Sequence, residues 1–239
     1  MKSCRGFTLV ELAMVLFVVS LLLGGLLVPL ATQIEARQRS DAEDQLEKIR
    51  EALVGFAIIN GRLPCHSTES DPASINYGME DPAAPCNPST ATAGWTGDGI
   101  LPWKTLGLNN SLDPWGVQRT ATADAWTGHW RYRVQSSFAS TFTLNTSPTT
   151  NRLCVLDASG NLLNSTSENP VAIIYSTGAN KTVEGLNVTY EATSTSTDCV
   201  NNTPITYQGG AASASFDDIT IWITRPLLFN RMVSAGVLP

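Results

Sequence analysis

The hydrophobic positions divide the chain into an apolar N-terminal run, an amphipathic stretch and a long mixed region. Residues 7–31 contain a single ionisable side chain, Glu11. As a helix this run would extend about 37 Å, enough to cross a hydrocarbon core of roughly 30 Å with some tilt. Lys2 and Arg5 precede it, and cations on that side favour an N-terminus that stays in the cytoplasm. The pattern predicts one membrane-spanning helix, with the rest of the chain exported.

Glu11 distinguishes this run from a plain membrane anchor. An unpaired carboxylate inside a membrane helix costs roughly 2.5–3.5 kcal/mol, so it marks a functional position. If the chain were cut after Gly6, the new α-ammonium of Phe7 would lie one turn from Glu11. Glu11 could then neutralise such a group on a neighbouring helix. The alternatives are a cleaved secretory signal, which has a shorter apolar run, and an uncleaved signal anchor.

The stretch after the apolar run predicts a continuation of the same helix. Its apolar residues recur at three- and four-residue spacings, which is typical of a helix that packs on a domain. They are Leu46, Ile49, Leu53, Phe56 and Ala57. Gly61 and Pro64 predict the end of the helix. We therefore expect one helix with a transmembrane half over residues 7–31 and an exported half over residues 32–60.

Residues 61–239 predict a globular α+β domain. Residues 61–125 are rich in Pro and Gly and predict a loop-rich insert. Strand patterns follow at residues 129–135, 141–145, 153–157, 171–177, 186–192 and 218–224. Residues 225–236 predict a short closing helix. The expected fold is a long N-terminal helix packed on an antiparallel sheet.

Composition and charge narrow the classes of protein. Six Trp, seven Phe and five Tyr can anchor a core, which argues against disorder. The net charge of −6 argues against a general nucleic-acid binder. A single apolar run excludes a polytopic transporter.

Four cysteines remain beyond the apolar run: Cys65, Cys86, Cys154 and Cys199. An even number in an exported domain predicts up to two disulfides, with three possible pairings. We favour the sequential pairing, Cys65 with Cys86 and Cys154 with Cys199, because it would fasten two turn-rich stretches. A zinc site is the alternative, but the chain has no C-x-x-C spacing and its two histidines stand alone.

The sequence predicts no catalytic residues. It contains no G-x-S-x-G, H-E-x-x-H or phosphate-loop motif. His66 lies beside Cys65, but a nucleophilic role would need a free thiol, which export argues against. We therefore expect a protein that is not an enzyme.

The segment RGFTLVEL, from Arg5 to Leu12, closely resembles the N-terminal signal of type IV prepilins and type II secretion pseudopilins. The resemblance implies that residues 1–6 are a class III leader peptide and that prepilin peptidase cuts after Gly6. It implies N-methylation of Phe7 by the same enzyme. It also implies that Glu11 pairs with the N-terminus of a neighbouring subunit during assembly.

A weaker resemblance to major pseudopilins lies further along the chain. It rests on the DPWG segment at residues 113–116, the STGAN segment at residues 176–180, and Asp217-Asp218-Ile219 followed by Trp222. In that subfamily the acidic loop binds calcium. Here Asn180 stands where the loop aspartate would be, and only Asp217 and Asp218 are clear oxygen donors. We assign no metal ligands and no cofactor, with calcium as the open alternative.

Together these features predict a structural subunit, minor rather than bulk, of a type II secretion pseudopilus or a type IV pilus. The resemblance implies three partners: prepilin peptidase, other pilin or pseudopilin subunits, and the inner-membrane assembly platform. It places the chain in the bacterial inner membrane as a single-pass protein with a periplasmic domain, and afterwards in a periplasmic pseudopilus or an extracellular filament. The alternative is a membrane-anchored periplasmic binding domain that does not polymerise.

Overall fold

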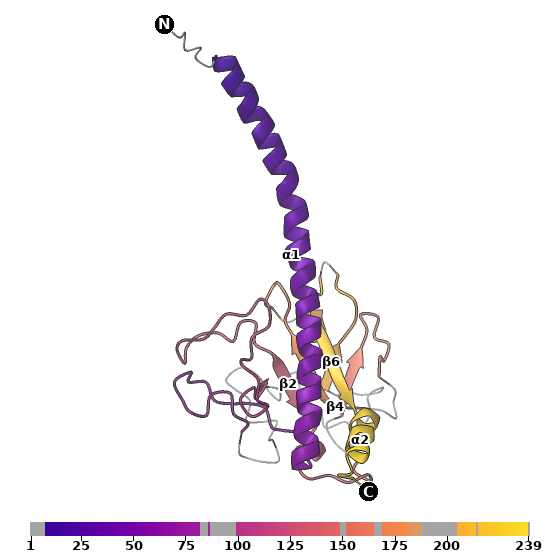
Figure 1. Ribbon diagram of the computed structural model, residues 1–239. Coiled ribbons are helices and arrows are strands. Elements are labelled where there is room, and N and C mark those ends of the chain that lie inside the picture. The colour runs from indigo at the N-terminus through magenta and orange to yellow at the C-terminus, as the bar shows by residue number, and fades with distance from the viewer. Residues whose placement is uncertain are drawn as a thin grey trace. The chain divides into compact units, whose positions relative to one another are not determined.

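The structure is a computed structural model. It describes residues 8–81, 86, 99–148, 152–164, 169–182, 184–185, 187, 205–213 and 215–238, without the side chains of 22–31 and 205–206. The chain forms two units, Met1–Ser40 and Asp41–Pro239. Helix α1 (Leu9–Asn60) comes first, strands follow, and a short helix α2 (Arg225–Ser234) closes the chain (Figure 1).

In the first unit, α1 presents apolar side chains that the protein itself does not cover. The side chains described between Thr8 and Leu21 are exposed, among them Leu9 at 85% and Phe17 at 67%. Among the described residues, no helix combines the length and apolar character that crossing a membrane requires. Part of the run that the sequence assigns to the membrane, residues 22–31, lies outside the described side chains.

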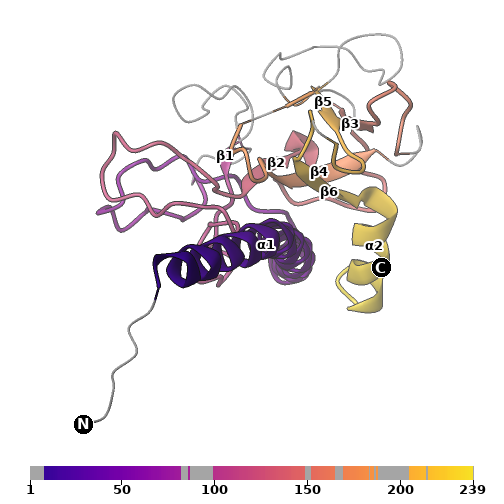
Figure 2. The same cartoon turned by 90° about the horizontal axis from the view of Figure 1, so that it is seen from above.

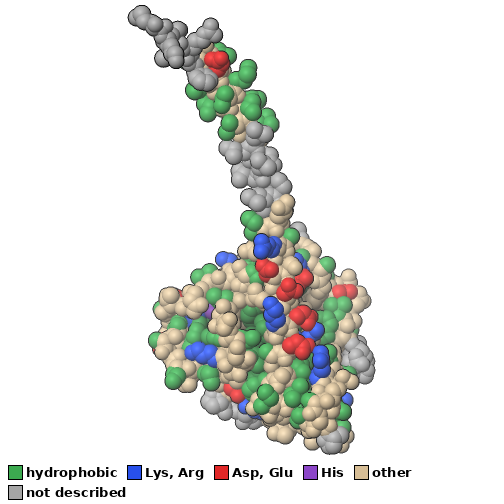
Figure 3. Space-filling model, viewed as in Figure 1, with side chains coloured by type: hydrophobic (Ala, Val, Ile, Leu, Met, Phe, Trp, Pro, Cys, Tyr) green, Lys and Arg blue, Asp and Glu red, His purple; other side chains and the backbone are tan. Residues whose placement is uncertain are grey.

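In the second unit, α1 buries one side and exposes the other. Of the predicted apolar stripe, Leu46, Ile49, Leu53 and Ala57 are buried, whereas Phe56 is half-buried beneath the Arg62 guanidinium. Charged side chains gather on the opposite side of this segment (Figure 3). The helix ends at Asn60, and Gly61 follows with a φ of +69°. The predicted amphipathic helix and its glycine stop are confirmed.

The main sheet lies beneath this part of α1. It contains β1 (Gly99–Ile100), β2 (Arg131–Val134), β4 (Pro170–Ser176) and β6 (Ile219–Thr224), in the order β1-β2-β4-β6. Every neighbouring pair is antiparallel. All seven residues of β4 are buried, which fits its continuous apolar sequence and its central position. The predicted packing of a helix on an antiparallel sheet is confirmed.

A second, two-stranded sheet covers the other face of the main sheet. β3 (Leu153–Leu156) pairs in parallel with β5 (Ile205–Gln208). Val155 and Tyr207 pack against Ile173 and Tyr175 of β4, while α1 lies on the opposite side (Figure 2). The sequence predicted an antiparallel sheet and no strand at 205–208, so it missed both β5 and its parallel pairing with the distant β3.

One predicted strand is wrong, and another lies largely outside the description. Residues 141–145 form a turn in which the Thr146 N–H donates to the Thr143 carbonyl over 2.9 Å. Phe142 accounts for the apolar pattern, since it is buried against Phe138 and Phe229 rather than on a sheet. Of the predicted strand at 186–192, only residue 187 is described.

Helix α2 closes the domain where the sequence predicts a helix. The Thr224 hydroxyl accepts the Leu227 N–H at its N-terminus, and a proline occupies the first turn. Leu228, Phe229 and Met232 are buried. The Arg231 guanidinium reaches Glu51 of α1 over 3.2 Å. An apolar face therefore fastens the C-terminal helix to the core, with an exposed ion pair at its edge.

A disulfide stabilises the turn-rich insert. Cys65 bonds to Cys86, and their Cα atoms lie 5.3 Å apart. The bond closes a loop with a sequence separation of 21, which is worth about 3 kcal/mol in chain entropy. Within that loop Glu80 makes two 2.8 Å hydrogen bonds with Arg62 and accepts the Cys65 N–H. The predicted Cys65–Cys86 pairing is confirmed. Cys154 is also disulfide-bonded, and Cys199 lies outside the described residues.

Candidate functional sites

The first candidate site is the beginning of α1. The predicted cleavage residues Gly6 and Phe7 lie outside the described residues. Glu11 Oε2 accepts both the backbone N–H and the hydroxyl of Thr8, each over 2.8 Å, and the Glu11 N–H donates to Thr8 Oγ1 over 3.3 Å. This reciprocal arrangement is a capping box, which satisfies donors that a helix start leaves without partners. Glu11 is exposed within this chain.

The capping box fixes the position of the Glu11 carboxylate on an otherwise apolar helix. Both hydrogen bonds from Thr8 reach the same oxygen, Oε2, and fix the carboxylate over the first turn. A carboxylate with partners from its own chain is easier to accommodate in an apolar environment than a bare one. The role of Thr8 was not predicted from the sequence, although Thr-x-x-Glu before an apolar run is the signature of a capping box.

The second candidate site is an acidic cluster in the globular unit. Asp217 and Asp218 precede β6, and Glu184 lies in the loop after β4. One carboxylate oxygen of each residue lies within 4.8 Å of the others. The sequence identified the two aspartates and missed Glu184. Asn180, at the position of the expected loop aspartate, donates to Glu184 Oε1 over 2.6 Å and so orients the acid that completes the cluster.

Backbone and amide donors hold the cluster together. The Asp217 N–H donates to Glu184 Oε2 over 2.8 Å, and the Glu184 N–H donates to Asp218 Oδ2 over 3.2 Å. The Asn187 amide also donates to Asp218 Oδ2 over 2.8 Å. These bonds leave Oδ1 of Asp217 and Oδ1 of Asp218 buried, with no hydrogen-bond partner among the described residues.

Ionising the three carboxylates of the cluster is energetically costly without a counter-ion. Asp218 is 1% exposed, and burial raises the pKa of its carboxyl to about 7, with further increases from Asp217 and Glu184. A buried oxygen without a partner carries a desolvation penalty. Three carboxylates facing one another suit a hard divalent cation, which binds oxygen ligands and neutralises their charge. The residues present therefore fit calcium, although three side chains supply only part of its six to eight oxygens.

The two weaker sequence motifs meet next to this cluster. Asp113 of the DPWG segment and Ser176 of the STGAN segment are both buried, and the Ser176 hydroxyl donates to Asp113 Oδ2 over 2.5 Å. Burial raises the pKa of Asp113, whereas the hydrogen bond from Ser176 lowers it. No pattern in the sequence predicted that these two segments are in contact.

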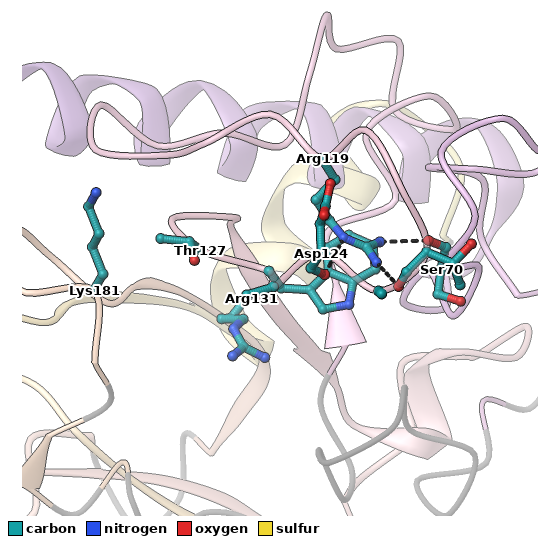
Figure 4. Close-up of a pocket in the computed structure, with 10 residues that line it drawn as sticks. Ser70, Arg119, Asp124, Thr127, Arg131 and Lys181 are labelled. Carbon is teal, nitrogen blue, oxygen red and sulfur yellow. Dashed lines mark hydrogen bonds between the residues drawn. The ribbon is translucent and has the colours of Figure 1, made fainter.

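A cavity of about 540 Å³ lies among Ser70, Arg119, Asp124, Thr127 and Lys181, together with Trp126 and Arg131 (Figure 4). Arg119 is buried and donates to the carbonyls of Ser70, Thr122 and Asp124. Its guanidinium lies 3.8 Å from the centre of the Trp126 ring, and Tyr77 stacks on that ring as well. Arg119, Trp126 and Tyr77 contact one another, so the aromatic cluster around Trp126 stabilises the loops.

Both histidines occupy buried positions in the domain. His66 and His129 are each 2% exposed, and burial lowers the pKa of each to about 4. Cys65, the neighbour of His66, is in the disulfide. The His129 ring nitrogen Nδ1 lies 3.2 Å from the Thr127 carbonyl. The Cys–His pair considered at the sequence level is therefore excluded by the disulfide.

Comparison with known proteins identifies the N-terminal segment. Residues 1–27 match the family model described as the prokaryotic N-terminal methylation motif. This match confirms the predicted type IV pilin and pseudopilin signal, and it implies processing by prepilin peptidase. It covers 27 of the 239 residues. No curated protein matches the chain, and no solved structure matches it.

Proposed function

We propose that the chain is a structural subunit of a type II secretion pseudopilus or a type IV pilus. The observation that carries the proposal is the methylation motif over residues 1–27. In this proposal prepilin peptidase cuts after Gly6 and methylates the new N-terminus at Phe7. The chain acts as a filament component, and its domain serves no catalytic role.

The apolar surface of α1 supports insertion into a membrane and then into a filament. The described side chains from Leu9 to Leu21 are exposed, so the unit needs an apolar environment to cover them. Lipid supplies that environment before assembly, and neighbouring helices supply it afterwards. We infer that residues 7–31 are the membrane half of α1 and that the domain is periplasmic. Other pilin-like subunits and the inner-membrane assembly platform are the expected partners.

Of the two filaments, we favour the secretion pseudopilus over the type IV pilus, with the chain as a minor subunit. The DPWG and STGAN segments support this preference because they resemble segments of major pseudopilins, and Asp113 and Ser176 bring the two into contact. The disulfide-closed insert supports a specialised position in the filament, since it adds a large loop-rich surface to the domain.

Deletion of the gene, followed by complementation, tests this function. Loss of secreted proteins without loss of surface filaments would support a pseudopilus, and the opposite result would support a type IV pilus. Complementation with the wild-type chain is the control. If neither secretion nor filaments change, the chain is an anchored periplasmic domain and the proposal is wrong.

We further propose that Glu184, Asp217 and Asp218 bind calcium. The supporting observation is the pair of buried Oδ1 atoms, on Asp217 and Asp218, which no described residue satisfies. The two positive charges of calcium would offset most of the charge of the three carboxylates and so fasten the loop after β4 to the start of β6. Asp218 contributes most to the site, because it is almost fully buried and its charge is the most costly.

Calcium is expected to stabilise the wild-type protein and to have no effect on an Asp218→Asn variant. At a calcium concentration about 100 times the Kd, binding adds about 2.7 kcal/mol, which corresponds to several degrees in Tm. Thermal unfolding in calcium and in EDTA measures the difference. Asp157→Asn, a change in an exposed turn, is the matched control and should retain the full calcium response. An equal Tm in calcium and EDTA for the wild type would contradict the assignment.

A further inference from the structure

A buried hydrogen bond joins two segments that are 63 residues apart in sequence. Ser176, the last residue of β4, is 0% exposed, and Asp113 is 5% exposed. The Ser176 hydroxyl donates to Asp113 Oδ2 over 2.5 Å, while Asp113 Oδ1 accepts the Trp115 N–H over 2.9 Å. A charge-assisted bond of this length between buried groups is strong and directional. It fixes the end of β4 relative to the DPWG turn.

The same hydroxyl also determines the turn that follows β4. Ser176 Oγ accepts the Gly178 N–H over 3.0 Å. Gly178 has a φ of +64°, a conformation that suits glycine, and a Cβ at this position would lie 2.6 Å from Asp217 Cγ. The turn therefore packs directly against the carboxylate of Asp217.

From this turn, two hydrogen bonds lead to the acidic cluster. The Asn180 N–H donates to Asp217 Oδ2 over 2.9 Å, and the Asn180 amide donates to Glu184 Oε1 over 2.6 Å. Asn180 Oδ1 in turn accepts from the Thr182 N–H and hydroxyl. The two acids thus take their orientation from the turn that Ser176 holds.

We propose that Asp113 and Ser176 are positioning residues for the calcium site, an inference that rests on the proposed calcium binding by Glu184, Asp217 and Asp218. Neither residue belongs to the acidic cluster. They act through the Gly178 turn, which places Asn180 so that it orients Asp217 and Glu184. Asn180 hydrogen-bonds two of the proposed ligands directly, and loss of such a group typically weakens metal affinity by about 10- to 100-fold.

A Ser176→Ala variant tests the proposal. The full-length chain in detergent is freed of metal with EDTA, returned to metal-free buffer and titrated with calcium chloride in a calorimeter. We expect the calcium Kd to rise about 10- to 100-fold relative to wild type. Ser176→Thr keeps a hydroxyl at the same position and is expected to recover most of the lost affinity.

Ser67→Ala is the matched control for the loss of a buried hydroxyl. Ser67 is 1% exposed, and its hydroxyl has no hydrogen-bond partner among the described residues. This variant should bind calcium like wild type. The Tm of each variant in EDTA reports stability separately, because a merely structural role for Ser176 would lower that Tm and leave the Kd of the folded protein unchanged.

The results separate this inference from the calcium proposal itself. If wild type binds calcium, Asp218→Asn does not, and Ser176→Ala binds with wild-type affinity, the positioning role is wrong and the calcium site stands. If wild type gives no calcium heat and no Tm shift, both are overturned. If Ser176→Ala does not fold, a weakened Kd in Asp113→Asn supports the positioning role, and an unchanged Kd overturns it.

Discussion

A Glu11→Ala variant is expected to fold and to be processed but to fail at filament assembly. Glu11 occupies the first turn of α1, where the Thr8 capping box fixes its carboxylate. In the proposed filament, this carboxylate pairs with the methylated N-terminal amine of a neighbouring subunit. Removal of one partner of a buried ion pair costs about 3–5 kcal/mol, because the other charge is left unpaired. We therefore expect incorporation to fall by roughly 100-fold or more.

The measurement is the fraction of the chain in sheared filaments or in cross-linked oligomers, beside the total amount in the membrane. Glu35→Ala is the matched control, since it removes another exposed acid from the same helix. That control should assemble normally. Wild-type incorporation of Glu11→Ala would contradict the assembly role, and a plain membrane anchor would tolerate the change.

Acid is expected to destabilise the domain through its two buried histidines. Burial lowers the pKa of His66 and of His129 to about 4, from 6.5 in the unfolded chain. Between these values the unfolded chain binds more protons than the folded one, so the stability present above pH 6.5 is lost as the pH falls towards 4. Each histidine should contribute a loss of about 3 kcal/mol over the whole window and about 2 kcal/mol by pH 5.

Charged side chains near each histidine also shift its pKa. Arg133 lowers the pKa of His66 and Asp81 raises it, whereas Arg119 and Arg131 lower the pKa of His129. Asp218 acts in the opposite direction, because its raised pKa favours the folded state as the pH falls.

Urea unfolding of wild type, His66→Gln and His129→Gln at pH 7.5 and pH 5.0 isolates the contribution of each histidine. Each variant should lose about 2 kcal/mol less than wild type over this interval, and an identical loss would refute the assignment.

The elements that the sequence predicted well are those with a strong local pattern. The stripe from Leu46 to Ala57 matches the buried side of α1, and the apolar run at 171–177 matches the central strand β4. The predicted closing helix at 225–236 matches α2, where a proline occupies the first turn and Gly236, with a φ of +73°, follows the C-terminal end. In each case a periodic pattern and a turn residue point to the same local structure.

The features that the sequence did not predict depend on contacts between distant residues. The parallel pairing of β3 with β5 joins residues about fifty positions apart, and nothing local in either strand specifies its partner. The apolar pattern around Phe142 resembled a strand, but Phe142 is buried by the aromatic rings of Phe138 and Phe229 and not by a sheet. Glu184 was missed because its role depends on the turn that brings it to Asp217 and Asp218.

The candidate sites show the same difference between local patterns and contacts of distant residues. The N-terminal motif is contiguous, so the sequence alone identified it, and the family match over residues 1–27 confirms it. The acidic cluster is assembled from the loop after β4 and the residues before β6, which are more than thirty positions apart. The sequence could therefore name Asp217 and Asp218 as donors but could not show that Glu184, Asn180 and Ser176 surround them.

The intact mass of the protein from its native membranes, with and without reductant, distinguishes a processed filament subunit from an uncleaved membrane protein. We expect a mass that begins at N-methylated Phe7 and increases on reduction by the hydrogens of two disulfides. A mass that still contains Met1 to Gly6 would contradict it, because an unprocessed chain cannot present the methylated amine that Glu11 is proposed to meet.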